Sequence, residues 1–278
     1  MMGGSMATFK FSGYDIYYER PNTGASTTPL VVLNGIFMSA ASWRMFLPPF
    51  ADVDIILLDL LDQGMSAKAH EEYTQVKQVE LTLALLAELR LERADVMGIS
   101  YGGEVALQLA AGYPDRVRRL VVSNTCAYTS PWLKDTGKSW EYAFASYDGH
   151  QFFKTCIPYV YAPKFYEDNY DWASALEELF VKYFGNDVYD AFARLTRSAE
   201  GHDVRGMLSH ITAPTMIISS EQDFITPVHQ QRELRDGIKG SSWVVIPDAG
   251  HAVMYEKPEA FAAIVKGFIM FDCKLTAV

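Results

Sequence analysis

The sequence predicts an α/β fold with a mostly parallel central sheet, helices on both faces of the sheet, and an inserted helical cap. Short, continuously apolar segments alternate with helical segments along much of the 278-residue chain. This alternation is typical of parallel strands that are buried on both faces. From about residue 127 to residue 210 it gives way to helical sequence crowded with aromatic side chains. A G-x-S-x-G motif stands between an apolar strand and a helix.

The expected elements follow one another in an order that suits this fold. They begin with a hairpin of two short strands at residues 9–11 and 16–18. Apolar strands follow at residues 29–33, 53–59, 94–97 and 120–124, and helices are expected at residues 76–89 and from residue 101. After the cap come two more strands and a closing helix: residues 214–220, 242–247 and 258–271. We therefore expect a core domain of residues 1–126 and 211–278 around a cap of residues 127–210.

The composition limits the partners and the compartment. A net charge of −10 disfavours a polyanion such as nucleic acid, and the 16 Tyr, 16 Phe and 5 Trp suit a cavity for an apolar small molecule. The three cysteines (Cys126, Cys156 and Cys273) form no paired framework, which fits a reducing compartment. The N-terminal residues lack an apolar signal segment, and no apolar run approaches about 18 residues. We expect a cytoplasmic protein without a membrane span, and its oligomeric state is left open.

The G-x-S-x-G motif predicts a nucleophile at Ser100. It reads Gly98-Ile99-Ser100-Tyr101-Gly102, with an apolar strand before it and a helix after it. A sharp strand-to-helix turn strains the backbone of the serine, and glycines on either side of it carry no Cβ that could clash. The turn holds the hydroxyl at a helix N-terminus, where backbone N–H groups can stabilise an oxyanion.

A serine nucleophile needs a base within hydrogen-bond reach, and the base needs an acid to orient it. Of six histidines, His251 follows the last predicted strand and comes after the acid in the chain, as this architecture requires. Asp223 follows the preceding strand and is the favoured acid. Glu221 competes from two residues earlier. Asp248 is close to His251 in the sequence, but a residue on the same short loop rarely reaches Nδ1.

The oxyanion hole is expected from two backbone N–H groups. One belongs to Tyr101, the residue after the nucleophile, and the other to the loop after the strand at 29–33. In that loop Ile36 is favoured, with Phe37 as the next choice, and Gly35 allows a close approach of the backbone. We also expect Asn34 and Phe37 to contact the substrate.

These residues together resemble the α/β-hydrolase fold family over nearly the whole chain. The resemblance rests on Asn34-Gly35, the D-x-x-x-x-G-x-S run from Asp59 to Ser66, the motif around Ser100, Asp223, and Gly250-His251. It implies that Ser100 is the nucleophile, His251 the general base and acid, and Asp223 the orienting acid. It implies little about the substrate.

The function predicted first is a serine hydrolase that cleaves an ester or thioester of an apolar acyl group. Many members of the family carry His-Gly where this chain has Asn34-Gly35. This local departure resembles the acyltransferases of rhamnolipid synthesis, which move hydroxyacyl groups from a carrier thioester to a hydroxyl, so acyl transfer is the alternative. Carbon–carbon bond hydrolysis on the same triad and a non-catalytic ligand-binding protein also stay open. Chemistries that use a carboxylate nucleophile are disfavoured, because Ser100 holds that position.

The sequence predicts no cofactor and no metal. The histidines are dispersed, and neither an H-E-x-x-H motif nor a cysteine cluster occurs. The glycines around Ser100 superficially suggest a dinucleotide-binding turn. The serine between them and the downstream Asp223 and His251 favour a nucleophile elbow instead.

Overall fold

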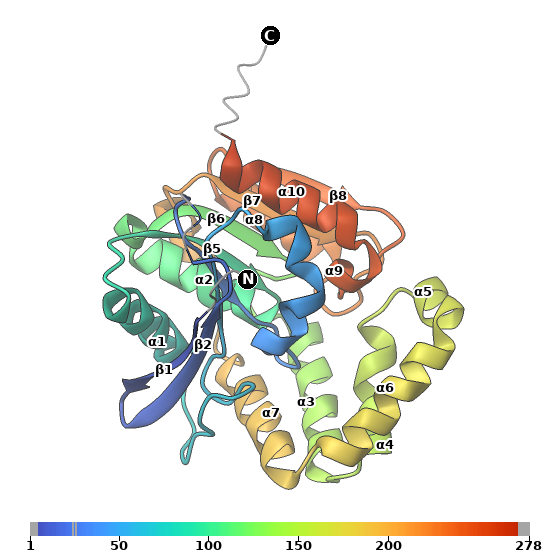
Figure 1. Cartoon of the computed structure of the whole chain (residues 1–278). Helices are drawn as coiled ribbons and strands as arrows, with labels where there is room; N and C mark the ends of the chain where they lie inside the picture. The colour runs from blue at the N-terminus through green and yellow to red at the C-terminus, as the bar shows by residue number, and fades with distance from the viewer. Residues whose placement is uncertain (1–4, 24, 26, 272–278) are drawn as a thin grey trace.

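The computed structural model describes residues 5–23, 25 and 27–271. Its centre is an eight-stranded sheet in the order β1-β2-β4-β3-β5-β6-β7-β8 (Figure 1). The strands are β1 (Ser5–Phe11), β2 (Tyr14–Arg20), β3 (Leu30–Leu33), β4 (Ile55–Leu58), β5 (Ala94–Ile99), β6 (Val117–Ser123), β7 (Thr215–Ser220) and β8 (Ser242–Ile246). The pairs β1–β2 and β2–β4 are antiparallel, and the others are parallel. The predicted fold class is confirmed.

Helices connect and cover the strands. The α-helices are α1 (Gln75–Glu88), α2 (Tyr101–Gly112), α3 (Pro131–Ala145), α4 (Gly149–Cys156), α5 (Pro163–Asp168), α6 (Tyr170–Tyr183), α7 (Asn186–Ser198), α8 (Val228–Gly237), α9 (Val253–Glu256) and α10 (Pro258–Met270). Short 3-10 helices lie at η1 (Ala40–Phe46), η2 (Pro48–Phe50), η3 (Pro114–Arg116), η4 (Ile157–Tyr159) and η5 (Arg205–His210).

Strands β3 and β4 are apolar throughout because both faces of the sheet are covered there. In β3, Val31 and Leu33 pack into one hydrophobic cluster, together with side chains of α1 and α2. Leu30 and Val32 of the same strand pack into a second cluster on the other face, with η1, η2, α9 and α10. Successive side chains of a strand point to opposite faces, so a strand buried between two helical layers has no polar face.

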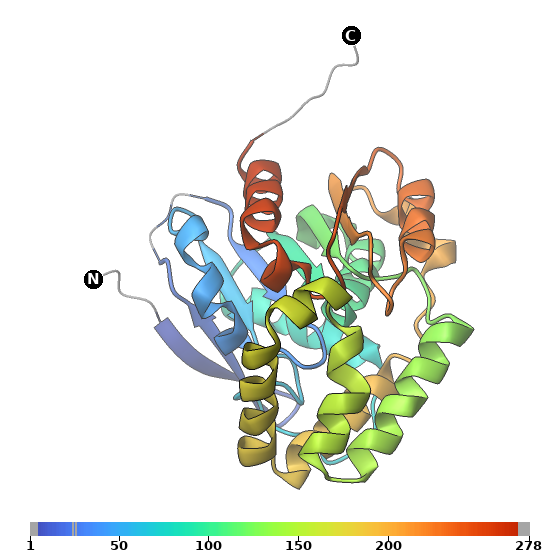
Figure 2. The ribbon, with the colours of Figure 1, turned by 90° about the vertical axis from the view of Figure 1, so that its right-hand side faces the viewer.

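Helices α3 to α7 come between β6 and β7 in the chain. Figures 1 and 2 show them together at one end of the molecule. Phe37, from the loop after β3, contacts this helical layer through four aromatic rings, whose centroids lie 5.1–6.1 Å from its own: Trp140, Phe144, Phe152 and Phe192. We keep the division into a core and a cap at residues 127 and 210 as a proposal about domains.

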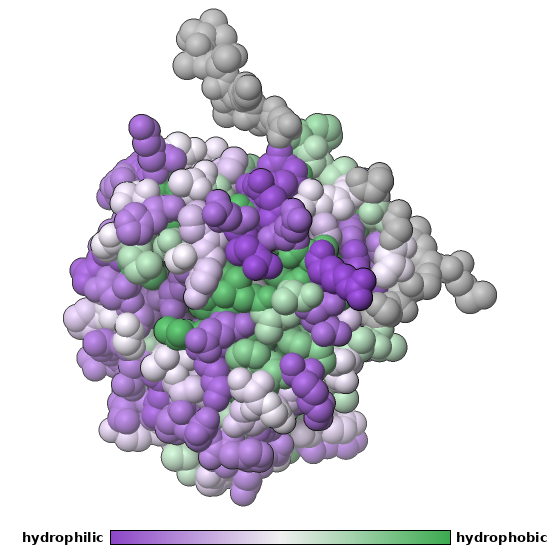
Figure 3. All heavy atoms as spheres, turned by 90° about the vertical axis from the view of Figure 1, so that its left-hand side faces the viewer, coloured by the Kyte–Doolittle hydropathy of each residue, from purple (hydrophilic) through white to green (hydrophobic). Residues whose placement is uncertain are grey.

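Helix α8 was not expected from the sequence. It is strongly polar and buries few side chains, among them Gln231 and Leu234, so it lacks the apolar stripe on which helix prediction relies. Among the described residues, no helix is long and apolar enough to cross a membrane. The face in Figure 3 is mostly hydrophilic around a smaller hydrophobic area. Cys273 and the N-terminal residues 1–4 lie outside the described residues.

One buried ion pair joins the loop after β4 to α7. Arg194 donates from Nη2 to Asp62 Oδ1 at 2.6 Å and from Nε to Asp62 Oδ2 at 3.1 Å. Asp62 also accepts hydrogen bonds from the Ala69 N–H at 2.9 Å and the Tyr73 hydroxyl at 2.8 Å. The Asp62 side chain is 0% exposed and that of Arg194 15% exposed. A buried carboxylate that loses its cation leaves an uncompensated charge.

We expect Arg194→Leu to lower the free energy of unfolding by about 3 kcal/mol, near the lower end for breaking buried ion pairs, since Arg194 keeps some solvent contact. Urea unfolding monitored by circular dichroism measures this. The matched control is Lys164→Leu, which removes an exposed cation paired with Asp168 and should leave the midpoint nearly unchanged. Equal midpoints for the two variants would show that the Asp62–Arg194 pair does not anchor α7.

Candidate active site

Ser100 lies at the sharp turn between β5 and α2. Its φ of 52° and ψ of −119° place it in a strained conformation that few non-glycine residues adopt. A Cβ on Gly98 would collide with the Gly102 carbonyl, and one on Gly102 with the Leu33 carbonyl. The two glycines therefore allow the turn to pass close to itself and to β3, and Ser100 projects from this close-packed backbone.

The structure brings Ser100, His251 and Asp223 together from three separate loops. His251 Nε2 lies 2.8 Å from Ser100 Oγ. His251 Nδ1 lies 3.0 Å and 2.9 Å from the two carboxylate oxygens of Asp223. The three loops follow β5, β7 and β8, whose carboxyl ends meet at one edge of the sheet. The spacing of the three side chains is that of a hydrogen-bonded nucleophile, base and acid.

Asp223 is held as a carboxylate by several donors. It accepts hydrogen bonds from the N–H groups of Ile225 and Thr226 at 2.9 Å, and from the Thr226 hydroxyl and Asn124 Nδ2 at 2.8 Å. Burial raises the pKa of Asp223, but the charge and hydrogen bond of His251 and the other donors together lower it below its ordinary value. An ionised Asp223 accepts a hydrogen bond from the Nδ1–H group of His251, which leaves Nε2 free to accept a hydrogen bond from the Ser100 hydroxyl.

The competing acids lie elsewhere. Glu221 and Asp248 are exposed, and Glu221 Oε2 accepts the Asp248 N–H at 3.1 Å. Glu221 lies in the exposed loop after β7, and Asp248 lies in the exposed loop after β8. Asp223 is the one of the three acids that is hydrogen-bonded to His251.

Sequence reasoning missed the part played by Asn124. It follows β6 and has a φ of 48°. Its amide donates to Asp223 and, at 2.9 Å, to Ser220 Oγ, while its oxygen accepts from Ser123 Oγ at 2.7 Å. The available signal was an asparagine directly after a buried strand, at the same sheet edge as the nucleophile. Asn124 therefore helps to fix the carboxylate that orients His251.

Glu256 was missed as well. It accepts the N–H of Gly250 at 3.0 Å and that of Ala162 at 3.1 Å. The Ala252 N–H donates to the Val160 carbonyl at 3.0 Å. On one side of His251, Ala252 is hydrogen-bonded directly to the segment between α4 and α5. On the other side, Gly250 is hydrogen-bonded to Glu256, which also binds that segment. The segment therefore helps to set the position of the imidazole.

The backbone predicted for the oxyanion hole lies beside Ser100. Tyr101 is the first residue of α2, so its N–H has no carbonyl acceptor within its own helix. The loop that contains Ile36 also approaches, because a Cβ built on Gly35 would stand 3.5 Å from Ser100 Cβ. Gln63 Nε2 donates to the Gly35 carbonyl at 2.9 Å. This bond ties the loop to the turn after β4, and the role of the two N–H groups stays a prediction.

The structure corrects the expected substrate contact of Asn34. The side chain is 0% exposed. Its amide donates to the Leu58 carbonyl at 2.8 Å, and its oxygen accepts from Trp43 Nε1 at 2.8 Å. Asn34 therefore joins β3, β4 and η1 and does not line the cavity at Ser100. Phe37 of the same loop does line it.

A cavity of about 300 Å³ opens over Ser100 and His251. Its other walls are mostly apolar side chains from the loop after β3, from α3, from the segment 157–161, from α6 and from α9. They include Trp172, Leu176, Phe180 and Met254. A second cavity, of about 50 Å³, also reaches Ser100, and its lining includes Thr129, Thr196 and Glu104. An apolar cavity with few polar groups around a reactive side chain is typical of a small-molecule site.

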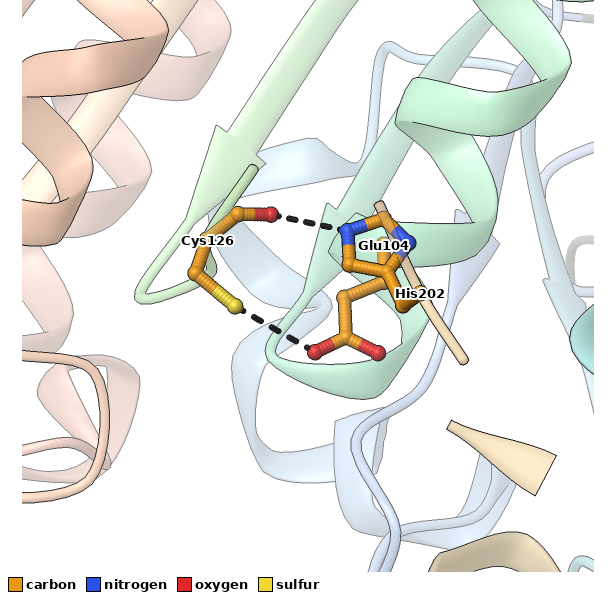
Figure 4. Close-up of side chains that lie close together, drawn as sticks. All are labelled: Glu104, Cys126 and His202. Atoms are coloured by element: carbon orange, nitrogen blue, oxygen red, sulfur yellow. Dashed lines mark hydrogen bonds between the residues drawn. The ribbon is translucent and has the colours of Figure 1, made fainter. Parts of the chain in front are cut away.

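A buried polar cluster of Glu104, Cys126 and His202 lies next to the nucleophile turn (Figure 4). Their potential ligand atoms lie within 4.8 Å of one another, which makes them a group that could hold a metal. Both ring nitrogens of His202 are already engaged, Nδ1 with Gln108 Nε2 at 3.0 Å and Nε2 with the Cys126 carbonyl at 3.0 Å. A metal would have to displace one of these bonds, so we assign none.

The cluster is instead part of a closed hydrogen-bonded ring. Cys126 Sγ donates to Glu104 Oε1 at 3.5 Å, and Gln75 Nε2 donates to Glu104 Oε2 at 2.5 Å. Gln108 Nε2 bridges Gln75 Oε1, at 2.7 Å, and His202. The ring ties α1, α2, the end of β6 and the chain after α7 together beneath Ser100. Burial raises the pKa of Glu104 against the opposing effect of His202 and Gln75.

This pKa shift has a consequence for stability. Above the ordinary pKa of a glutamate, 4.5, the unfolded chain loses the Glu104 proton while the folded chain keeps it. The unfolded state then binds fewer protons, so the free energy of unfolding falls as the pH rises. We expect Glu104→Gln, which cannot ionise, to gain stability relative to the wild type as the pH rises through the range above 4.5.

Urea unfolding of both proteins across that pH range measures the difference, with the exposed Glu178→Gln as the matched control. A constant difference between Glu104→Gln and the wild type at every pH would contradict the raised pKa. The same trend in Glu178→Gln would assign it to net charge rather than to burial.

Comparisons with known proteins identify the family to which this fold belongs. Residues 28–258 match the family model described as the alpha/beta hydrolase fold. The crystal structure of MGS-M2, described as an alpha/beta hydrolase enzyme from a Medee basin deep-sea metagenome library, superposes with a TM-score of 0.91 at 43% identity, covering 94% of this chain and 96% of that one.

Curated relatives carry hydrolase names. An uncharacterized hydrolase, YugF, of Bacillus subtilis is 26% identical, over 94% of this chain and 96% of its own. A 2-hydroxymuconate semialdehyde hydrolase of Pseudomonas sp. strain CF600 is 26% identical, over 87% of this chain and 86% of its own. With the family model spanning most of the sequence, the chain belongs to the alpha/beta hydrolase fold family.

Proposed function

We propose that this protein is a serine hydrolase that cleaves a carboxylic ester or thioester through an acyl-enzyme on Ser100. The observation that carries the proposal is the continuous hydrogen-bonded series from Ser100 Oγ through His251 to Asp223, with bonds of 2.8 Å and 2.9 Å. The strained turn at Ser100 and the apolar cavity above it support the same conclusion.

The first half of the reaction forms the acyl-enzyme. Ser100 Oγ attacks the carbonyl carbon while His251 Nε2 takes its proton, and Asp223 stabilises the imidazolium that results. The carbonyl oxygen becomes an oxyanion, which we assign to the N–H groups of Ile36 and Tyr101. When the bond to the leaving group breaks, His251 returns its proton to the leaving oxygen or sulfur, and the alcohol or thiol departs.

The second half releases the acid. Water takes the place of the leaving group and gives a proton to His251 Nε2 as its oxygen attacks the acyl carbon. The second tetrahedral intermediate collapses, and His251 returns the proton to Ser100 Oγ. The ester and water are thereby converted to an alcohol and an acid, and the enzyme is unchanged.

The alternative of acyl transfer to a hydroxyl rested partly on the Asn34-Gly35 pair. Since Asn34 is bound to Trp43 and Leu58, its side chain gives no reason to expect an acceptor alcohol there. A protein that only binds a ligand would not need an aligned serine, histidine and aspartate, so the triad also argues against a non-catalytic binding protein. One relative is named a 2-hydroxymuconate semialdehyde hydrolase. For this chain we favour ester cleavage over carbon–carbon bond hydrolysis because the larger cavity is predominantly apolar.

We expect a fluorophosphonate to add once to the wild-type protein and not to Ser100→Ala, as measured by intact mass. With p-nitrophenyl esters, Ser100→Ala should lose on the order of 10⁶ in kcat, whereas Asp223→Ala should lose on the order of 10⁴, because the acid only orients and stabilises the base. Product analysis with an added alcohol separates hydrolysis from acyl transfer.

The control is Ser139→Ala, which changes an exposed serine on α3. It should retain the adduct. Full ester cleavage by Ser100→Ala would refute the proposal, as would a folded wild-type protein that neither forms the adduct nor cleaves any ester.

A further inference from the structure

Two cavities of unequal size meet at the candidate nucleophile. The larger is about 300 Å³ and the smaller about 50 Å³. Ile36, Ser100 and Trp140 line both. Trp140 is only 7% exposed, and its ring lies 5.1 Å from that of Phe37. The indole is therefore held in place as a wall between the two cavities.

The position of His251 distinguishes the cavities chemically. His251 and the four residues after it line the larger cavity, and they are absent from the lining of the smaller one. The leaving oxygen of an ester must take its proton from His251 Nε2, so it has to lie within hydrogen-bond reach of that atom. The leaving group therefore extends into the larger cavity.

The position of the acyl group follows from the positions of the other three substituents on the carbonyl carbon. The carbonyl carbon of the tetrahedral intermediate bears Ser100 Oγ, the oxyanion, the leaving group and the acyl chain. If the oxyanion faces the N–H groups of Ile36 and Tyr101 and the leaving group occupies the larger cavity, the acyl chain is left with the smaller cavity, which also reaches Ser100. Ile225 and Thr226 are among the residues that line this smaller cavity.

The sizes then set the substrate class. A water-sized group needs roughly 10–15 Å³ of such space, so the smaller cavity holds about three or four heavy atoms and the larger on the order of twenty. We propose, resting on the serine hydrolase assignment, that the enzyme prefers esters of a short acid, of acetyl to propionyl size, with a long apolar alcohol. Trp140 is the residue that limits acyl length.

Two isomeric esters test this proposal. Hexyl acetate and methyl heptanoate have the same formula and differ only in which side of the ester carries the long chain. We expect the wild type to favour hexyl acetate in kcat/KM by roughly tenfold or more, since a misfit of even one methylene costs about tenfold. Trp140→Ala removes the wall and should raise kcat/KM for methyl heptanoate toward that for hexyl acetate.

The matched control is Trp172→Ala, which removes an equally large ring from the larger cavity and should give no gain with methyl heptanoate. A second variant, Gly137→Ala, acts in the opposite direction. Gly137 lines the smaller cavity, where an added Cβ would stand 3.0 Å from Thr196 Cγ2. It should lower kcat/KM for hexyl acetate relative to hexyl formate, so the proposal remains testable if Trp140→Ala does not fold.

The outcomes separate this proposal from the function on which it rests. A wild type that forms the Ser100 adduct and prefers methyl heptanoate would overturn the assignment of the two cavities and leave the serine hydrolase intact. Equal gains with methyl heptanoate in Trp140→Ala and Trp172→Ala would overturn the role of Trp140. Absence of both the adduct and ester cleavage would refute the hydrolase itself, and this inference with it.

Discussion

The backbone turn at Ser100 is the constraint on which the rest of the structure depends. A non-glycine residue at a φ of 52° is costly, and the surrounding fold has to maintain it. Gly98 and Gly102 let the turn approach itself and β3, and a Cβ on Gly103 would stand 2.7 Å from Thr125 Cβ. The Ser100 N–H donates to the Ser123 carbonyl at 2.9 Å. The strained residue is therefore fixed by the central strands β3, β5 and β6, which are buried on both faces.

The other groups of the site are fixed to this centre from several directions. Asn124 and Thr226 hold Asp223, and Glu256 holds the loop before His251 and the N–H of Ala162. The aromatic contacts of Phe37 bring the helical layer α3 to α7 against the same edge of the sheet. The cavities are thus formed between a rigid sheet edge and a layer whose position depends on packing and on the Asp62–Arg194 pair.

The fold and the three candidate catalytic side chains could be predicted because they follow from local patterns and chain order. The motif at Ser100 and the apolar strands are local, and acid and histidine follow successive strands. The use of Asn34 could not be predicted in this way, since the direction of a side chain beyond a strand depends on neighbours that are remote in sequence, here Trp43 and Leu58. Helix α8 has no apolar stripe. Glu256 bonds to Ala162, and Trp140 divides the cavities, through contacts that only the tertiary structure brings together.

A crystal structure of the protein with a phosphonyl group attached to Ser100 tests the central claim most directly. The phosphoryl oxygen imitates the oxyanion, and the account predicts that it lies about 2.7–3.1 Å from the N–H nitrogens of both Ile36 and Tyr101. His251 should remain hydrogen-bonded to Asp223 and face the remaining phosphonate oxygen. A phosphoryl oxygen that points away from both N–H groups, or an imidazole separated from Asp223, would contradict the account.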